Sequence, residues 1–471
     1  MERQNCFKLY NEEERSQLEQ LAADYRKFLT DCKTERESVR EVVRQAEAAG
    51  YRNMEDLMQN GGEQLQPGAK LYTVCMGKAV ALFRLGEQPL SAGLNILGAH
   101  VDSPRLDIKQ NPLFEAGELA FLDTHYYGGI KKYQWVTLPL ALHGVVVKKD
   151  GQTVDIVIGE DADDPVFCVT DLLIHLAQEQ LEKKGARVVE GEALNLLVGN
   201  AALADIDAAD KSDEQKKAAK QAVKANILRL LEEKYGLQEE DFISAELEVV
   251  PAGAARESGL DRSMILAYGP YDAACAYPSL RAMLEVENSQ RCACCLLVDK
   301  EEIGSVGATG MQSRFFENAV AELLNLTGEF SELNLRRLLQ RSRMLSSDVS
   351  SAYDPAYASA FEKNNVAYLS HGLVFNKFTG ARGKSGSNDA NAEYLGWLRQ
   401  VMDAAGVHYQ TAELGKVDLG GGGTIAYILA LYGMEVIDSG VPVLSMHAPW
   451  EVTSKADIYE AYKGYKAFLM A

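Results

Sequence analysis

Two motifs, one near residue 100 and one near residue 300, have the residue types of a metal centre. In GAHVDSP, His100 and Asp102 follow an apolar run and lie two residues apart, on the same face of an extended chain. A metal-bound imidazole usually donates its second N–H group to an oxygen atom, so Asp102 suits a role in orienting His100. A histidine in such a place is by itself more often a satisfied structural residue. The pair therefore indicates a metal site only in combination with further ligands.

A second motif, LLVDKEEIGSVGATG, runs from an apolar strand into Glu301 and Glu302 and then into a glycine-rich turn. Adjacent carboxylates point in different directions, so one can bind a metal while the other removes a proton from the attacking water. We assign Glu302 to the metal and Glu301 to the general base. An exposed acidic loop is the alternative interpretation of the same motif.

Three more residues complete a candidate two-metal site. Asp348 in SSDVSSAYDP and His447 in VPVLSMHAPWE follow apolar runs, and Asp272 in LAYGPYDAACAYPSL stands at a strand-to-helix junction. Asp272 is the candidate bridge between two ions, with Asp261 as the nearest competitor. Oxygen and imidazole ligands suit Zn²⁺, and Mn²⁺ or Co²⁺ also fit. The sequence thus predicts two divalent metal ions per subunit.

The elements that would position these residues alternate between strands and helices. This alternation predicts an α/β fold with a mixed, mainly parallel sheet flanked by helices, whose strand ends would gather the ligands in one crevice. A chain of 471 residues also needs more than one core. We expect a catalytic domain over 1–108 and 256–471, interrupted by an inserted β-rich domain over 109–255. Within these domains we expect two helices in 12–49 that separate near Thr30, a hairpin that turns at 149–151, a helix over 167–182 and an exposed helix over 212–235.

Composition excludes some partners. The 48 basic and 68 acidic side chains give a net charge of −20, which disfavours nucleic acid and anionic membranes. The N-terminus lacks the pattern of a secretory signal, and no apolar stretch is long enough to span a bilayer, so we expect a cytoplasmic protein. The cysteines lack zinc-finger spacing, and Cys292, Cys294 and Cys295 fit a buried strand.

The motifs GAHVDSP, DKEEIGS and LSMHAPWE, in this order, resemble those of the aspartyl aminopeptidases, the M18 family of di-zinc peptidases. The segment GGGGTIAYILALYGMEVIDSGVPVLSMH is similar to the family's C-terminal signature. The resemblance implies a metallo-aminopeptidase in which the inserted domain serves dimerisation and dimers form a tetrahedral homododecamer. It also implies one metal on His100, Asp272 and Asp348, and a second metal on Asp272, Glu302 and His447.

The substrate pocket departs from the family pattern. Lys377 matches a lysine that meets an acidic substrate side chain, whereas Tyr133 stands where the family has a histidine lent to a neighbouring subunit. Preference for acidic or neutral N-terminal residues therefore stays open. Two other functions also stay open: a two-metal amidohydrolase that acts on N-acyl amino acids, and a catalytically silent assembly protein.

Overall fold

The computed structural model describes residues 4–59, 65–203 and 221–471 of the chain. It divides into two compact units. The first comprises Met1–Ser103, Ala255–Met446 and Trp450–Ala471, and the second comprises Pro104–Ala254 together with His447–Pro449. The insertion predicted at 109–255 overlaps the second unit.

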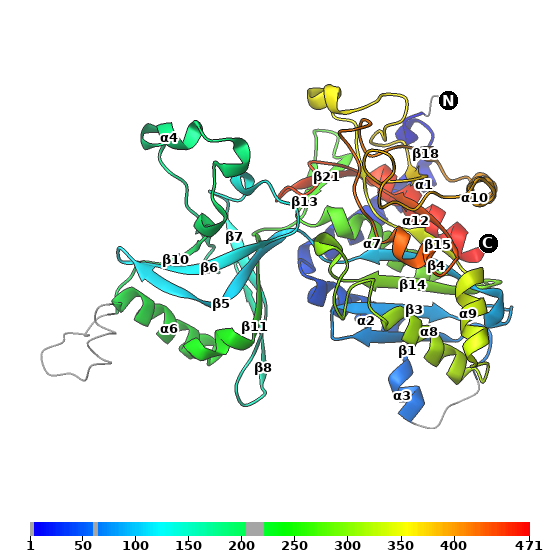
Figure 1. Cartoon of the computed structure of the whole chain (residues 1–471), viewed down its shortest axis with the longest axis horizontal. Helices are drawn as coiled ribbons and strands as arrows, with labels where there is room; N and C mark the ends of the chain where they lie inside the picture. The colour runs from blue at the N-terminus through cyan, green and yellow to red at the C-terminus, as the bar shows by residue number, and fades with distance from the viewer. Residues whose placement is uncertain (1–3, 60–64, 204–220) are drawn as a thin grey trace, which may run out of the picture. The chain divides into compact units, whose positions relative to one another are not determined.

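The first unit is built on a nine-stranded sheet (Figure 1). The four central strands, β14, β4, β15 and β19, are mutually parallel, while β2, β3 and β17 add antiparallel pairs. The predicted mixed, mainly parallel sheet is confirmed. In sheet order the strands are β1 (Arg52–Asn53), β2 (Lys70–Cys75), β3 (Ala79–Arg84), β14 (Cys292–Val298), β4 (Leu94–His100), β15 (Arg343–Ser346), β19 (Glu435–Gly440), β17 (Leu373–Asn376) and β18 (Tyr409–Thr411).

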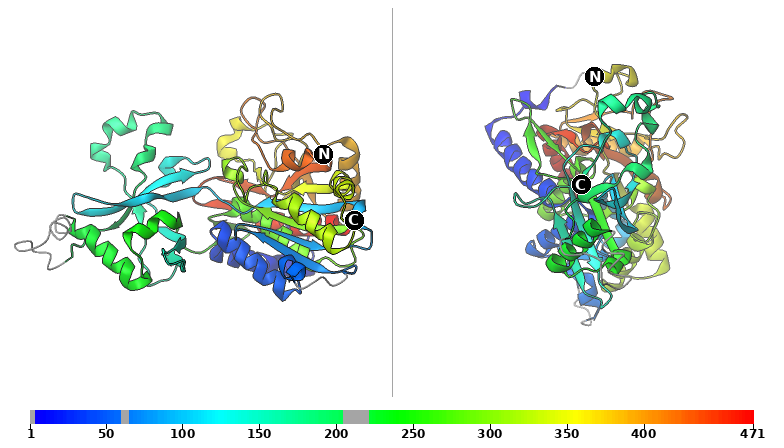
Figure 2. Two further views of the ribbon diagram at one scale, coloured as in Figure 1. Left: turned by 60° about the horizontal axis from the view of Figure 1, so that its bottom comes forward. Right: turned by 90° about the vertical axis from the view of Figure 1, so that its left-hand side faces the viewer.

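Helices cover both faces of this sheet, as Figures 1 and 2 show. Neighbouring residues of β14 enter different cores: Cys295 packs with one face and Cys294 with the other. A strand buried on both faces has to be apolar throughout, which explains the run CACCLLV. One core includes α1 (Glu12–Asp31), α2 (Glu35–Ala48), α7 (Pro270–Glu285), α10 (Ala392–Ala404) and α12 (Lys455–Met470). The other includes α3 (Met54–Gln59), α8 (Phe315–Leu326), α9 (Glu332–Arg341) and α11 (Ala426–Ala430).

The two predicted N-terminal helices are confirmed, and capping fixes where each begins. Asn11 and Glu14 form a capping box at the start of α1, and Thr34 and Glu37 form another at the start of α2. Each box satisfies backbone N–H groups that have no partner within the helix. The two helices are therefore separated between Asp31 and Glu35, next to the predicted position at Thr30.

A smaller, five-stranded sheet also belongs to the first unit. In sheet order it contains β12 (Arg256–Ser258), β13 (Met264–Ala267), β21 (Glu451–Ser454), β20 (Pro442–Leu444) and β16 (Ser350–Ser351). The short 3-10 helices of this unit are η1 (Cys6–Lys8), η2 (Leu90–Ala92), η8 (Glu301–Ile303) and η9 (Pro355–Ala360).

The second unit contains a seven-stranded antiparallel sheet, with the predicted hairpin between β7 and β8. Its strands, in sheet order, are β8 (Thr153–Ile158), β7 (Leu140–Val147), β11 (Ala245–Pro251), β5 (Arg105–Ala116), β6 (Leu119–Tyr127), β10 (Leu196–Gly199) and β9 (Cys168–Val169). Its helices are α4 (Gln178–Leu181), α6 (Ala222–Tyr235), η3 (Lys132–Gln134), η4 (Ile174–Leu176), η5 (Gly185–Arg187), η6 (Gly191–Ala193) and η7 (Glu239–Ser244).

The helix predicted over 167–182 is wrong. The segment forms β9, η4 and α4 instead, and its leucines and its isoleucine are exposed, whereas Val169 and Ala177 are buried. A short helix needs tertiary packing of its apolar face, and the exposed leucines and isoleucine of this segment are left largely uncovered by the described residues. Of the helix predicted over 212–235, α6 accounts for Ala222–Tyr235, and residues 212–220 lie outside the described part of the chain.

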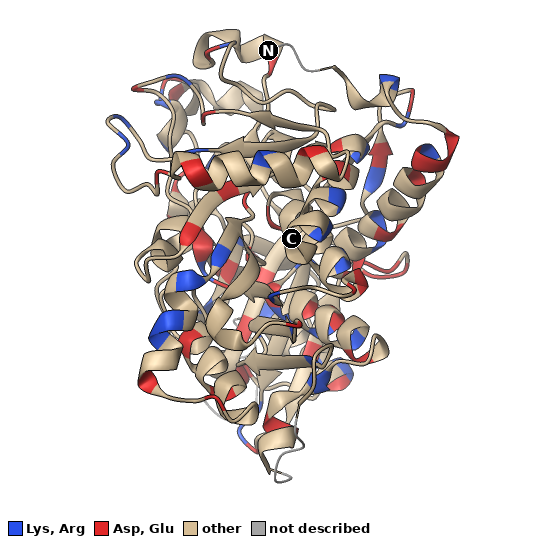
Figure 3. Ribbon diagram, turned by 90° about the vertical axis from the view of Figure 1, so that its right-hand side faces the viewer, with Lys and Arg blue, Asp and Glu red and all other residues tan. Residues whose placement is uncertain are grey.

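Charged side chains of both signs are intermixed on the helices in Figure 3. Among the described residues, no helix combines the length and apolar character that crossing a membrane requires.

Candidate metal centre

His100 is the last residue of β4, and its ring is held in one orientation. The distance from Nδ1 to the main-chain oxygen of Asp102 is 3.0 Å. Because a carbonyl oxygen only accepts hydrogen bonds, Nδ1 carries a proton, and Nε2 is the ring nitrogen that can bind a metal in place of a proton. Nε2 is buried, has no hydrogen-bond partner among the described residues, and lies 3.8 Å from Oδ1 of Asp348. This is the arrangement that a metal ligand requires.

Asp348 follows β15 by two residues and is almost fully buried. The backbone N–H of Val349 donates to Oδ1 of Asp348 at 2.7 Å. Gly440 of β19 makes room for this segment, since a Cβ atom there would lie 1.8 Å from the Asp348 main-chain oxygen. Potential ligand atoms of His100, Glu301 and Asp348 all lie within 4.8 Å of one another.

The cluster has a strong affinity for positive charge. Burial lowers the pKa of His100, but the carboxylates of Asp102 and Asp348 outweigh burial and raise it well above its usual value. Burial, reinforced by Asp348, raises the pKa of Glu301 to about 9. The Glu301 shift arises first from burial and then from the nearby carboxylate of Asp348, and the His100 shift arises from the carboxylates beside the ring. A divalent cation among them would supply the missing charge, so the residues fit a metal.

Asp102 fastens the Glu301–Glu302 turn to β4. Its Oδ1 accepts a hydrogen bond from the Glu301 backbone N–H at 3.0 Å, and its Oδ2 accepts one from the Glu302 N–H at 3.1 Å. Lys300 makes this possible by adopting a left-handed conformation, with φ of 70°, directly before η8. The turn after β14 therefore depends on a carboxylate from the segment that follows β4, a contact that sequence spacing did not predict.

Asp272 lies in the first turn of α7 and is buried. Ser103 Oγ donates to its Oδ1 at 2.6 Å. Burial raises the pKa of Asp272 to about 6, against the lowering effects of His100 and Ser103. Its predicted competitor, Asp261, is exposed and accepts hydrogen bonds from Ser263.

His447 has different surroundings. It follows β20 of the five-stranded sheet, not a strand of the nine-stranded sheet, and it belongs to the second compact unit. Its Nδ1 lies 3.0 Å from the Gly129 main-chain oxygen, and its φ is 67°. In the first unit the potential ligand atoms of His100, Glu301 and Asp348 come together, and Asp102 holds the backbone of Glu301 and Glu302. Asp272 is in the same unit, near enough to His100 for that residue to affect its pKa, whereas His447 lies in the second unit.

The two candidate substrate-binding residues lie on the surface. Tyr133 is in η3 of the second unit, with 47% of its surface exposed. Lys377 directly follows β17 in the first unit, and its Nζ lies 3.9 Å from Oδ1 of Asp389. Asp389 also pairs with Lys384 at 3.0 Å. The positive charge of Lys377 is thus partly offset by a neighbouring carboxylate.

Sequence reasoning missed three neighbours of the site. These neighbours are Ser103, Tyr271 and Glu451. The ring centroid of Tyr271 lies 5.1 Å from that of His100, and Oε2 of Glu451 accepts a hydrogen bond from the Tyr271 backbone N–H at 2.7 Å. The available signal was their position, because each lies in or next to a motif that carries a candidate ligand.

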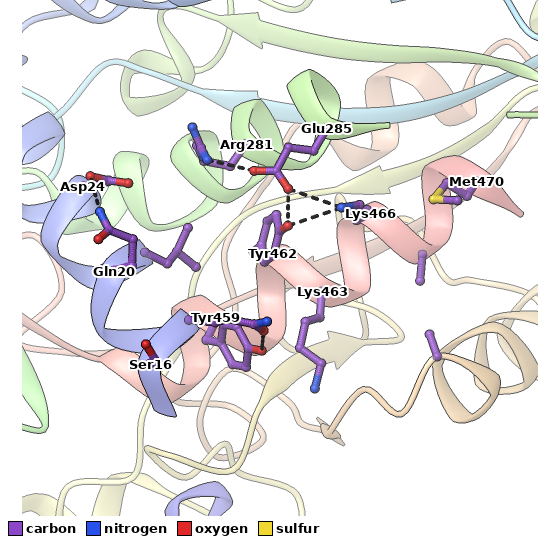
Figure 4. A pocket seen from close by; sticks show the side chains of 14 residues that line it. Ser16, Gln20, Asp24, Arg281, Glu285, Tyr459, Tyr462, Lys463, Lys466 and Met470 are labelled. Carbon is purple, nitrogen blue, oxygen red and sulfur yellow. Dashed lines mark hydrogen bonds and ion pairs between the residues drawn. The ribbon is translucent and has the colours of Figure 1, made fainter. Parts of the chain in front are cut away.

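A separate pocket of about 810 Å³ lies among α1, α7 and α12 (Figure 4). Its charges neutralise each other: Glu285 binds Arg281 at 2.8 Å, Lys466 at 3.2 Å and the Tyr462 hydroxyl. None of its lining residues is a candidate ligand. The chemistry therefore belongs to the His100 cluster.

Comparison with known proteins shows to which family the chain belongs. The sequence model of the aminopeptidase I zinc metalloprotease (M18) family matches residues 28–469. The chain belongs to the M18 family. It is a metallo-aminopeptidase, a hydrolase of peptide bonds.

Several M18 relatives align over nearly their whole length. A probable M18 family aminopeptidase 1 from Clostridium acetobutylicum is 57% identical over 99% of this chain and 98% of its own length. The Thermotoga maritima relative of the same name is 43% identical, over 100% and 99%. The crystal structure of an M18 aminopeptidase from Thermotoga maritima superposes with a TM-score of 0.92 at 42% identity, covering 100% of this chain and 99% of that one. That of aminopeptidase I from Clostridium acetobutylicum gives 0.91 at 54% identity, with the same coverage.

Proposed function

We propose that this M18 chain removes the N-terminal residue of peptides at a two-metal centre, with Glu301 as the general base. The observation that carries the proposal is the buried, unpartnered Nε2 of His100, 3.8 Å from Asp348 and close to Glu301. The proposed metals are zinc, with Mn²⁺ or Co²⁺ as alternatives. One ion would bind His100, Asp272 and Asp348, and the other would bind Asp272, Glu302 and His447.

Each residue has a chemical task in this scheme. When bound, the two ions would polarise the scissile carbonyl and increase the acidity of the attacking water. Glu301 takes a proton from that water and passes it to the leaving amine. Its burial supports this role because a desolvated carboxylate is a stronger base than an exposed one. Asp102 positions Glu301 and Glu302 through their backbone N–H groups.

A panel of aminoacyl chromogenic substrates, supplemented with divalent metals, tests the proposal. It should include acidic, aliphatic and basic residues together with N-acylated amino acids. Release only from the N-acylated compounds would favour the amidohydrolase. No turnover, no bound metal and no effect of Glu301→Gln would favour the silent assembly protein. Because Asp389 offsets the charge of Lys377, we expect neutral residues to be accepted as well as acidic ones.

We also propose that the second unit mediates assembly into a homo-oligomer. Five aliphatic side chains within ten residues are each at least half exposed, which is typical of a protein interface: Leu172, Leu173, Ile174, Leu176 and Leu181. A solved S. cerevisiae mApe1 structure, 20% identical, is described as a dodecamer. A tetrahedral dodecamer of dimers is the assembly that we propose here. The free thiols of the eight cysteines suit the proposed cytoplasmic location.

A further inference from the structure

One hydrogen bond fastens a glycine-rich loop to the buried end of the central sheet. The loop is Gly420–Gly423, and the next residue, Thr424, is buried. The Thr424 hydroxyl donates to Oδ1 of Asp438 on β19 at 2.6 Å. Asp438 is 1% exposed, so this bond anchors the loop inside the protein, not on its surface.

Asp438 depends on this hydroxyl more than an exposed carboxylate would. Oδ1 has a second and longer contact, 3.3 Å from the Ser346 hydroxyl, and Oδ2 has no hydrogen-bond partner among the described side chains and backbone. Burying a carboxylate with few donors is costly, and each remaining hydrogen bond to it is correspondingly valuable. The Thr424–Asp438 bond is therefore expected to hold the loop in one position.

The anchor lies on the same face and the same end of the sheet as the candidate ligands. In the parallel register, Gly98 of β4 is opposite Ser346 of β15, and Ser346 is opposite Asp438. His100 comes two residues after Gly98 on β4 and so shares its face. Asp348 follows the end of β15, two residues after Ser346, and so lies at the same end of the sheet. Ile425, next to Thr424, packs toward Gly98, since a Cβ atom there would lie 3.6 Å from its Cδ1.

The exposed part of the loop presents main-chain N–H and C=O groups and no side chains beyond those of glycine. Gly421–Gly423 are exposed, and a Cβ atom on Gly422 or Gly423 would meet nothing within 4 Å. Gly420 and Gly421, by contrast, need to be glycine because of close packing: a Cβ atom would lie 1.7 Å from the Leu414 main-chain oxygen and 2.5 Å from Ala381 Cα, respectively. The anchored half is tightly packed, and the open half can approach another main chain without a side chain in the way.

We propose that Thr424 and Asp438 are positioning residues that hold the Gly421–Gly423 backbone against the main chain of the peptide substrate. This inference rests on the proposed aminopeptidase function. The loop contributes N–H and C=O groups, so it recognises the peptide backbone and not a particular side chain. Neither Thr424 nor Asp438 touches the reacting atoms. Their effect is on the affinity for peptide.

The experiment compares Thr424→Val, which removes the hydroxyl at constant shape, with Thr424→Ser, which keeps it. Thr327→Val is the matched control, because the Thr327 hydroxyl donates to Leu323 O at 3.2 Å at the end of α8. We expect Thr424→Val to raise KM for a tetrapeptide about tenfold, the value of one hydrogen bond to a buried charge. We expect kcat and metal content to stay near wild type.

The KM values of these variants, read together with their Tm, decide whether Thr424 positions the loop. Restoration of KM by Thr424→Ser, with Thr327→Val unchanged in KM, supports the positioning role. The positioning role is overturned if KM is unchanged in Thr424→Val, or if KM rises equally in Thr424→Ser. It is also overturned if the loss of activity is explained by a lower Tm alone. Failure of the wild-type protein to hydrolyse any aminoacyl substrate would instead refute the proposed function.

Discussion

Asp102 accepts a hydrogen bond from the backbone N–H of Glu301 at 3.0 Å, so the proposed general base is positioned by a carboxylate from the segment that follows β4. We expect Asp102→Asn to reduce kcat about 10- to 100-fold, as loss of an outer-shell partner does. The amide has an NH2 group in place of one of the two acceptor oxygens, so one of the two backbone N–H groups would face a donor and lose its present hydrogen bond. Steady-state kinetics and metal analysis check this. Asp261→Asn, a change at an exposed aspartate, serves as the control and should leave kcat unaltered.

Glu301→Gln keeps the shape of the side chain and removes its ability to take a proton. If Glu301 is the general base, kcat should fall by about 10²-fold or more, while bound metal stays at the wild-type level. Single-turnover assays and elemental analysis of the same preparations measure both quantities. Near-normal turnover in this variant would assign the proton transfer to another group.

The stabilising effect of divalent metal should increase as pH rises from 5 to 9. Burial raises the pKa values of Asp272 to about 6 and of Glu301 to about 9, so the folded protein binds these protons more tightly than the unfolded chain does. Their contribution to the free energy of unfolding is full below pH 4 and is lost as pH rises through the folded-state values. A cation offsets that loss. Thermal unfolding measured with EDTA and with Zn²⁺ across this pH range tests the prediction. A difference in Tm between the two samples that does not change with pH would contradict the prediction.

Gly440→Ala should destabilise the protein and lower its metal content. The added Cβ would lie 1.8 Å from the Asp348 main-chain oxygen, so β19 or the Asp348 segment has to move. Gly396→Ala in α10 is the matched control, because its Cβ would meet nothing within 4 Å. In a helix interior that exchange is expected to stabilise by about 0.5–1 kcal/mol. Thermal unfolding of both variants gives the comparison.

Charge in the exposed aliphatic segment should weaken assembly. The double change Leu173→Glu and Leu176→Glu places carboxylates where 58% and 69% of the side-chain surface is exposed. Burying these carboxylates in an interface would be unfavourable, so the mass of the assembly measured by light scattering should fall. Leu260→Glu, at a fully exposed leucine of the first unit, controls for charge alone. An unchanged mass in the double variant would place the interface elsewhere.

The sequence predicted best where local pattern and sheet topology agree. His100 and Glu301 follow apolar strands that turned out to be parallel neighbours, so their proximity could be anticipated from the rule that such strand ends meet. His447 also follows an apolar strand, but linear order does not reveal which sheet a strand joins, and β20 joined the smaller one.

Two other features could not be predicted from the sequence, for physical reasons. The pattern at 167–182 has the composition of a helix, yet a helix also needs a surface to pack on, and periodicity carries no information about that surface. The contact of Asp102 with the Glu301 and Glu302 N–H groups depends on the left-handed Lys300, a conformation that lysine seldom adopts.

The burial of the cysteines has a practical consequence for spectroscopy. Six of the eight thiols are buried, including all three in β14, whereas Cys75 and Cys168 are partly accessible. These two lie in different units, Cys75 in the first and Cys168 in the second. A maleimide donor and acceptor pair attached to the native chain would therefore report the separation of the two units by energy transfer, and its change when peptide is added, without any engineered labelling site.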